Sequence, residues 1–435
     1  MKYSLVILLL IAICTKVQGQ IDIEIVGTLP EPVANNAVCE GFVNDTNYLY
    51  SFGGIDETKI YSGIHSRCFR YNIETGIAER IADLPDDRAK IASWASRIGD
   101  IIYIAGGYYV SSNGSEESSN KMHRYDIVNN EFLEDGADIP RAIDDQVQVV
   151  WRDSLIYLVT GWSNNGNVTN VQIYNPSEDS WVTGTALPNS NDYRSFGASG
   201  SIVGDTIYYF GGAGSIGGFN VQNDIRKGVI NPSNPTQIEW SLIETQETKV
   251  GYRMASTSRA NKIYWIGGSE VTYNFNGIAY NGSGGVPLSN RILELDADSL
   301  QWNEYSFEEV PMDLRGHADV SENEKYLAGG MSFDLEVTDK IYRITFTNDI
   351  SATKDNFFQK QIKVFPNPFQ ENILIEHIGG EDTSVNIYTA EGKCVYSKLL
   401  VNQKSEIELN FLNSGLYILS ITNGKAIAKS LLYKL

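Results

Sequence analysis

An apolar, aromatic segment that ends in glycine recurs six times along the chain. Each copy is rich in Val, Ile, Tyr and Phe, which fit the half-buried surface of a β-sheet. A terminal glycine permits the positive φ or close backbone approach of a tight turn. The six copies end at Gly54, Gly107, Gly161, Gly212, Gly268 and Gly330. The intervals between these glycines are 53, 54, 51, 56 and 62 residues, so the pattern predicts a β structure of six similar units.

The residues around each glycine strand complete a four-stranded unit. Small residues dominate the preceding segment, as in 91–96 and 254–260, and they suit an innermost strand beside a narrow axis. A third strand follows, with a central aromatic residue at Tyr71, Tyr125, Tyr174 and Tyr342. A fourth strand ends in an apolar residue and proline, at Leu84-Pro85, Ile139-Pro140, Leu187-Pro188 and Val310-Pro311. Small sheets of this kind bury their faces by stacking around an axis, which predicts an all-β, six-bladed propeller.

The last unit lacks a fourth strand of its own. Its third strand covers residues 341–346 and the pattern then stops, whereas residues 23–29, followed by Pro30, have the pattern of an outer strand. We expect this N-terminal strand to complete the sixth blade, because such closure removes exposed sheet edges. The propeller is therefore predicted over residues 20–349.

The Tyr-x-x-Gly-Gly strands, the downstream tyrosines and the Leu-Pro ends resemble the kelch repeat. All six units carry the resemblance in the same order. The chain departs from it where Trp162 follows the single Gly161, and where Lys227, Gly228 and Val229 replace the expected aromatic residue. The resemblance implies a kelch-like propeller.

A second unit is predicted over residues 362–435, after a linker at 350–361. Its short alternating strands and turn signals suit a small β-sandwich. The unit resembles the C-terminal sorting domain of type IX secretion at Pro366, Asn367, Pro368, Gly392, Lys393, Gly415, Leu416, Tyr417, Lys429 and Lys434. The resemblance implies recognition of this unit by an outer-membrane translocon, its usual removal, and a product that is released or attached to the cell surface. The alternative is an ordinary accessory sandwich.

The first 19 residues are predicted to be a signal peptide. Lys2 supplies the positive charge and residues 5–14 the apolar stretch, with cleavage expected before Gln20. A lipoprotein signal at Cys14 is the alternative. No later stretch approaches 18 apolar residues, so no membrane span is expected after signal removal. Export through the periplasm to the cell surface or the medium is the predicted localisation.

The acidic composition narrows the choice of partner. The 435 residues carry a formal net charge of −20, which disfavours nucleic acid as a ligand. The four histidines show no metal-ligand spacing with one another or with cysteine. No nucleophile elbow, Walker loop or dinucleotide fingerprint is present. We therefore predict no metal and no cofactor, and we interpret the acidic pairs Asp86-Asp87 and Asp144-Asp145 as solvated turn residues.

Five arginines precede the innermost strands and form the first candidate site. They are Arg88, Arg141, Arg194, Arg253 and Arg315. If the repeats keep one register, these side chains converge on one mouth of the central channel, where guanidinium groups can bind carboxylates. The alternative is a structural role, in which they pair with acidic residues of neighbouring blades such as Asp87, Asp145 and Asp192.

The second candidate site is the long loop at 271–290. It carries Tyr273, Phe275 and Tyr280 in a Gly-, Ser- and Asn-rich context. Variable loops on a rigid scaffold often form binding surfaces, and aromatic rings can stack on sugars. The alternative is a loop that only covers the next blade.

These observations favour an exported, non-enzymatic module that binds a glycan or a protein. The kelch resemblance implies that the arginine face binds acidic peptides in some members. It also admits an enzyme, because other six-bladed bacterial relatives are sialic-acid anomerases. In the enzymatic alternative, an arginine-lined mouth would act with Glu40, His317 or Asp319, which lie on predicted inner strands and could transfer protons during ring opening.

Overall fold

The computed structural model describes residues 21–347, 362–377, 383–389, 393–400, 404–422 and 427–435. The chain divides into two compact units, one at Ile21–Thr347 and one in the C-terminal part. The predicted signal peptide at 1–19 and the predicted linker at 350–361 lie outside the described residues.

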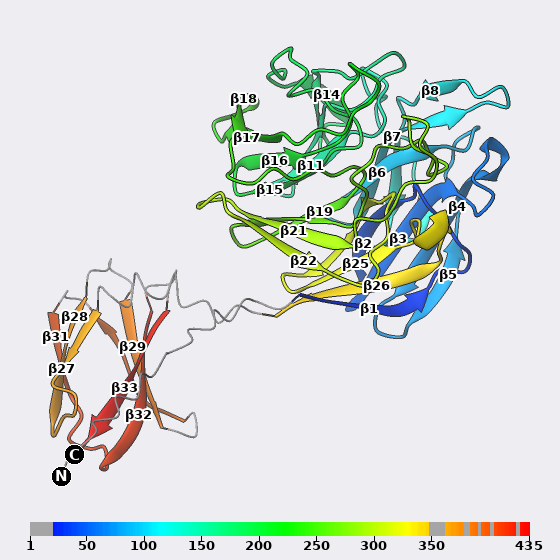
Figure 1. Cartoon of the computed structure of the whole chain (residues 1–435). Helices are drawn as coiled ribbons and strands as arrows, with labels where there is room; N and C mark the ends of the chain where they lie inside the picture. Colours follow the sequence, from blue (N-terminus) through cyan, green and yellow to red (C-terminus); the bar gives the residue numbers. More distant parts are fainter. Residues whose placement is uncertain (1–20, 348–361, 378–382, 390–392, 401–403, 423–426) are drawn as a thin grey trace, which may run out of the picture. The chain divides into compact units, whose positions relative to one another are not determined.

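Six antiparallel sheets form the first unit (Figure 1). The first sheet contains β2 (Ala37–Val43), β3 (Thr46–Ile55), β4 (Ile64–Asn72) and β5 (Ile77–Ile81), with β23 (Arg315–Gly316) parallel to β2. The second contains β6 (Ile91–Ile98), β7 (Ile101–Val110), β9 (Met122–Asp126) and β10 (Glu131–Phe132), with β8 (Glu116–Ser118) against β7. The third contains β11 (Val147–Trp151), β12 (Leu155–Val159), β13 (Val171–Asn175) and β14 (Ser180–Thr183).

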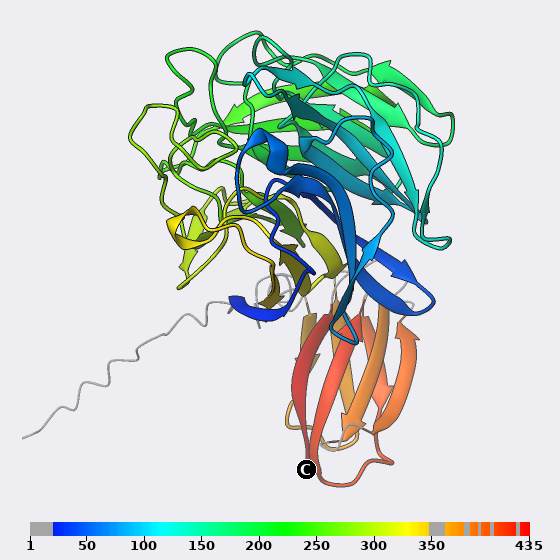
Figure 2. The same cartoon turned by 90° about the vertical axis from the view of Figure 1, so that its right-hand side faces the viewer.

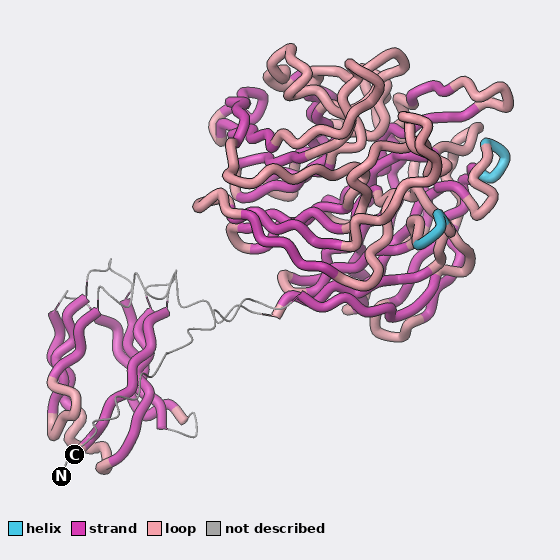
Figure 3. Tube along the Cα trace, viewed as in Figure 1, coloured by secondary structure: helices cyan, strands magenta, loops and turns pink. Residues whose placement is uncertain are grey.

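The remaining three sheets repeat this order. The fourth contains β15 (Ser199–Val203), β16 (Thr206–Phe210), β17 (Ile225–Asn231) and β18 (Asn234–Ile243). The fifth contains β19 (Ala255–Arg259), β20 (Lys262–Ile266), β21 (Arg291–Asp296) and β22 (Trp302–Ser306). The sixth contains β24 (Ala318–Ser321), β25 (Glu324–Ala328), β26 (Lys340–Phe346) and β1 (Ile21–Thr28). Two short 3-10 turns, η1 (Tyr61–Gly63) and η2 (Phe333–Leu335), lie in connecting loops (Figure 3).

The innermost strands contact one another in the order β2, β6, β11, β15 and β19. Strand β19 then contacts β23, which pairs with β2, and β24 also contacts β2. The six sheets are therefore the blades of a closed propeller, which confirms the predicted fold class. Blade six is completed by β1, which pairs antiparallel with β26 and places Glu24 opposite Arg343. Strands from both ends of this unit thus form one sheet.

The glycine pairs connect each blade to the next. In blade four, Gly211 has a φ of +67°, and a Cβ at this position would lie 2.2 Å from the carbonyl oxygen of Gly251. The N–H of Gly212 donates to this same carbonyl at 2.8 Å. Blade three has Thr160 in place of the first glycine, with a φ of +49°. Its hydroxyl donates to the carbonyl of Ser195, so a side-chain hydrogen bond accompanies the strained backbone.

Blade four also shows why its third strand lacks an aromatic residue. A Cβ on Gly228 would lie 2.3 Å from the ring of Trp240, which belongs to the adjacent outer strand β18. The indole covers Gly228 and packs against Tyr209. The aromatic side chain of this blade is therefore supplied by its neighbouring strand.

The C-terminal unit is a β-sandwich, again as predicted (Figure 2). One sheet contains β27 (Ile362–Phe365), β28 (Asn372–His377) and β31 (Lys404–Glu408). The other contains β30 (Cys394–Leu400), β29 (Thr383–Thr389), β32 (Gly415–Thr422) and β33 (Ile427–Lys434). Both sheets contribute to one buried apolar core, which includes Ile373, Ile407, Ile387, Leu419 and Leu432.

Candidate functional site

One residue with positive φ stands before the innermost strand of every blade or, for Ala92 in β6, at its start. These six residues are Asn35, Ala92, Asp145, Gly197, Arg253 and Asp313. Backbone hydrogen bonds join successive blades here, for example from the N–H of Arg253 to the carbonyl of Gly197 at 2.9 Å. We call these six residues the axial ring, and we call the side of the propeller that carries the loops after each glycine pair the loop face.

Four charged residues meet across the axis at the axial ring. Arg253 lies 2.8 Å from a carboxylate oxygen of Asp145 and 3.3 Å from one of Asp313. Arg315 lies 2.7 Å from the other oxygen of Asp145, and Asn35 donates to Asp313 at 2.7 Å. All of these side chains are buried. This axial cluster links blades one, three, five and six.

The axial cluster contains two guanidinium groups and two carboxyl groups. Burial alone would raise the pKa of Asp145, but the guanidinium groups of Arg253 and Arg315 lower it below its usual value. Burial raises the pKa of Asp313 in spite of the same two arginines. Since both guanidinium groups already face carboxylates, the axial cluster offers no free cation to an anionic ligand.

The other three predicted arginines do not join this cluster. Arg88 is exposed and pairs with Glu117 at 2.5 Å, and Arg141 bonds to Ser163 and Asn170. Relative to the axial ring, Arg88 and Arg141 precede Ala92 and Asp145 by four positions, and Arg194 precedes Gly197 by three. The predicted single ring of five arginines is therefore wrong, because connections of unequal length place these arginines at different levels.

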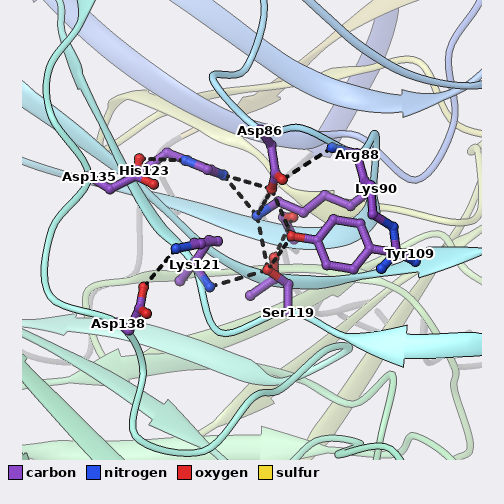
Figure 4. A network of polar contacts seen from close by, with 12 residues as sticks. Asp86, Arg88, Lys90, Tyr109, Ser119, Lys121, His123, Asp135 and Asp138 are labelled. Atoms are coloured by element: carbon purple, nitrogen blue, oxygen red, sulfur yellow. Dashed lines mark hydrogen bonds and ion pairs between the residues drawn. The ribbon is translucent and has the colours of Figure 1, made fainter.

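A buried polar network lies beside Arg88 in blade two (Figure 4). Lys90 Nζ lies 2.9 Å from Nε2 of His123 and 3.2 Å from a carboxylate oxygen of Asp86. Tyr109 donates to the same Asp86 oxygen at 2.9 Å, and Nδ1 of His123 lies 2.7 Å from Asp135. Burial lowers the pKa of Lys90 to about 8, although the charge of Asp86 acts in the opposite direction. Because each group has partners within the protein, this network fits a structural role.

A small pocket of about 80 Å³ opens on the loop face above the axial cluster. Its walls are aromatic, and its other side chains carry three carboxyls, one amide and one guanidinium. The lining residues are Tyr108, Glu116, Asp144, Asp145, Trp162, Phe196, Phe219, Arg253, Asn274 and Tyr280. Loops or strand ends from blades two to five therefore meet at this site, which we call the loop-face pocket.

The acidic pair at 144–145 is not solvated, contrary to our interpretation of the sequence. Asp144 is 4% exposed and Asp145 is 3% exposed. Asp145 joins the axial cluster, whereas Asp144 turns to the pocket and accepts a hydrogen bond from Ser118 at 2.6 Å. Burial, followed by the adjacent charge of Asp145, raises the pKa of Asp144 well above its usual value.

The three aromatic residues predicted in the 271–290 loop have different environments. Tyr280 lines the loop-face pocket, with its ring 4.9 Å from that of Phe219. Tyr273 is fully buried against Tyr252, so it cannot stack on a ligand. Phe275 is partly buried against the apolar cluster that contains Tyr252 and Tyr273. The loop therefore supplies Asn274 and Tyr280 to the pocket and otherwise covers the loop face.

Trp162, Phe196 and Phe219 line this pocket but were not predicted as site residues. Trp162 was visible only as a departure from the repeat, Phe196 precedes an inner strand, and Phe219 lies in a Gly-rich loop. Their rings pack edge to face at 5.3 to 5.6 Å between centroids. The sequence signal for these walls was an aromatic residue in each of three successive connections on the loop face.

A second cavity of about 220 Å³ lies along the channel between the inner strands. It brings together Glu40, His317 and Asp319, the residues considered for proton transfer. Glu40 pairs with Arg97 at 3.4 Å and accepts the backbone N–H of Asp319. Burial lowers the pKa of His317. These three residues do not line the loop-face pocket, so they cannot act on a ligand bound there.

Asn367, one of the predicted sorting residues, joins the β27–β28 connection to β33. The side chain of Asn367 donates to the carbonyl of Leu431 at 2.7 Å and accepts the N–H of Tyr433 at 2.9 Å. It is flanked by Pro366 and Pro368. Tyr417 is buried on β32, which starts at Gly415. Gly392 lies outside the described residues.

The described residues contain neither a metal-binding cluster nor a membrane-spanning helix. No group of three or more His, Cys, Asp or Glu side chains there could hold a metal ion. In that same part of the chain, no helix has the length and apolar character needed to cross a membrane. The described cysteines are free thiols at Cys39, Cys68 and Cys394.

Comparisons with known proteins match both units. Residues 363–434 match the family described as secretion system C-terminal sorting domain. Kelch-like protein 36 of Bos taurus is 25% identical over 257 residues, 54% of this chain and 39% of that protein. Kelch-like protein 36 of Mus musculus is 28% identical over 174 residues, 40% of this chain and 26% of that protein. The chain thus spans less than half the length of these two relatives.

A solved structure supports the propeller assignment. The structure of YjhT has a TM-score of 0.56 and 14% sequence identity, and the match covers 74% of this chain and 100% of that chain. At this identity the likeness concerns the fold alone. The chain is therefore a β-propeller with kelch-like relatives. Its C-terminal part matches a secretion sorting domain, which indicates export by type IX secretion to the cell surface or the extracellular space.

Proposed function

We propose that the exported propeller is a glycan-binding module and that the loop-face pocket holds one group of the glycan. The observation that carries this proposal is the combination of aromatic walls with buried hydrogen-bonding groups. Trp162, Phe219 and Tyr280 offer apolar ring surface, and Asp144 and Asn274 offer polar atoms for hydroxyl groups. Such a mixture of apolar walls and a few fixed polar groups is typical of small-ligand sites.

The pocket volume of about 80 Å³ limits what enters. A water molecule occupies about 30 Å³ in the liquid, so the pocket takes a substituent or one edge of a sugar ring, and the rest of the glycan lies on the rim. A folded protein is the alternative ligand. It would need a broad complementary face of the propeller instead of a small pocket.

The test is a glycan array followed by calorimetry on the mature protein and on Tyr280→Ala. We expect specific glycan binding that weakens by about tenfold in the variant, since loss of an anchoring aromatic residue typically costs more than 1 kcal/mol. Tyr61→Ala is the matched control, because Tyr61 is 46% exposed on another loop and does not line the pocket. Equal affinities of the two variants, or no glycan binding, would contradict the proposal.

A second candidate, a sugar anomerase, is favoured by one observation. Asp144 and Asp145 are adjacent carboxyls whose pKa values shift in opposite directions, an arrangement found where one group holds a proton and the other is ionised. Proton NMR of freshly dissolved N-acetylneuraminate distinguishes the two functions, since only an enzyme accelerates anomer exchange.

A further inference from the structure

The loop-face pocket has an excess of carboxyl groups. Glu116, Asp144 and Asp145 line it, opposed by the single guanidinium of Arg253. That guanidinium already pairs with Asp145 and Asp313. Among the described residues, no cationic side chain forms an ion pair with Asp144 or Glu116. The pocket therefore contains acid groups for which the protein supplies no partner of opposite charge.

Asp144 is held in place at the pocket without a cationic partner. Its side chain is buried, and its backbone is fixed by two hydrogen bonds to Trp162, both of 2.9 Å. One carboxyl oxygen accepts the hydroxyl of Ser118, and the carboxyl group lines the pocket. A buried carboxyl without a cation is costly, and a positively charged ligand group relieves that cost.

The aromatic walls suit the same kind of ligand. Trp162, Phe219 and Tyr280 surround the pocket beside the acids. Aromatic faces attract ammonium groups through the ring quadrupole, and this attraction is stronger where water is excluded. A carboxylate adds a charge-assisted hydrogen bond. The acidic net charge of the chain, −20, favours the approach of cations as well.

We propose that the loop-face pocket binds the ammonium group of an amino sugar, with Asp144 and the rim residue Glu116 as its counter-charges. This inference rests on the proposed glycan-binding function and specifies its ligand class. An amine attached directly to a sugar ring needs little depth, which agrees with the small volume. The ring itself then lies against the aromatic rim.

The test compares short β-1,4-linked oligomers of glucosamine, N-acetylglucosamine and glucose by calorimetry at slightly acidic pH. The three backbones are alike and differ at carbon 2, which bears an ammonium, an acetamide or a hydroxyl group. We expect the glucosamine oligomer to bind about tenfold more tightly than the other two, as for a gained charge-assisted hydrogen bond. Equal affinities for all three would overturn the amine proposal and leave the glycan-binding function in place.

Charge-removing variants test whether the preference for glucosamine depends on the pocket carboxyls. Glu116→Gln and Asp144→Asn remove a charge and keep the shape, so we expect each to reduce the preference for glucosamine several-fold. Glu117→Gln is the control, because Glu117 lies on the same strand but pairs with Arg88 and does not line the pocket. If Asp144→Asn does not fold, Glu116→Gln at the exposed rim still tests whether the preference for glucosamine depends on the pocket carboxyls. An unchanged preference in Glu116→Gln and in folded Asp144→Asn would overturn the proposal.

Proton release gives a second readout on the unaltered protein. Asp144 lines the pocket with Glu116 on β8, Asp145, Arg253, Tyr108 and Tyr280, and burial raises the pKa of its carboxyl. Binding of an ammonium ion favours the ionised carboxyl, so a proton leaves. Titration in buffers of different protonation enthalpy should detect this release with glucosamine oligomers and not with glucose oligomers. Absence of any binding to glycans would remove both proposals together.

Discussion

The axial cluster shows how four side chains from different blades depend on one another. Arg253 and Arg315 each pair with Asp145, and all three side chains are almost completely buried. The gain from these pairs is offset by the cost of removing the charges from water. Loss of one member leaves another charge buried without a partner, which is why single substitutions here are damaging.

We expect Arg253→Met to destabilise the propeller by about 3–5 kcal/mol, because Asp145 and Asp313 lose a cation. The measurement is urea unfolding followed by tryptophan fluorescence. All seven tryptophans belong to the propeller, so the signal reports on that unit alone.

Arg88→Met is the matched control for this prediction. Arg88 forms an exposed pair with Glu117, and exposed pairs contribute less than about 1 kcal/mol. Similar losses in both variants would show that burial does not distinguish the two arginines.

The spacing of the arginines in the sequence could not have shown which of them lie at the axis. Arg253 is an axial-ring residue, Arg315 follows Asp313 by two positions, and Arg88 precedes Ala92 by four. All three precede a glycine strand by similar numbers of residues. The connections between blades differ in length, so equal spacing in sequence does not mean equal height along the axis.

At the scale of elements, the closing strand β1 joins residues that are more than 300 positions apart in sequence. Ile23 pairs with Ile344, and Glu24 lies directly opposite Arg343 and forms an ion pair with it. The hydroxyl of Tyr71 in blade one also donates to the carbonyl of Val26 at 2.9 Å. The strand thus completes blade six and contacts blade one.

We expect a disulfide to form on oxidation of a Glu24→Cys, Arg343→Cys double variant. Residues opposite each other on antiparallel strands have Cα atoms about 4.5–5.5 Å apart, within the range that a disulfide spans. The bond should stabilise the propeller by about 2–4 kcal/mol through loop closure. Mass spectrometry and urea unfolding measure both effects.

The control for this register is Asp22→Cys with Arg343→Cys. Asp22 pairs with Thr345, so its diagonal distance to position 343 is about 7–8 Å, too long for an unstrained bridge. Efficient bridging in the control and not in the opposed pair would contradict the described register.

At the scale of the whole molecule, the chain consists of two compact units. The propeller contains the loop-face pocket, and the sandwich matches a secretion sorting domain over residues 363–434. Each unit has its own buried apolar core, which is the physical condition for independent folding.

We expect a variant that lacks residues 362–435 to accumulate in the periplasm instead of leaving the cell. The fluorescence unfolding midpoint of its propeller should match that of the full chain, because the tryptophans and the propeller core remain. Cell fractionation and urea unfolding measure the two outcomes. Export of the truncated protein would show that the sorting unit is not required.

The sequence by itself determined the architecture of this protein. Six glycine-ended strands, the unpaired third strand at 341–346 and the Pro-Asn-Pro segment are local patterns, and each reports directly on a turn, a missing neighbour or a strand connection. Strand periodicity and turn chemistry are short-range properties, so they can be read without coordinates.

Only the tertiary structure decided the site. Asp144 and Asp145 are neighbours in sequence and both line the pocket, yet only Asp145 pairs with Arg253, which is 108 residues away. Tyr273 and Tyr280 lie on one loop, but only Tyr280 lines the pocket. Burial and charge pairing depend on which connections of different blades meet at the axis, and that meeting is a property of the closed ring.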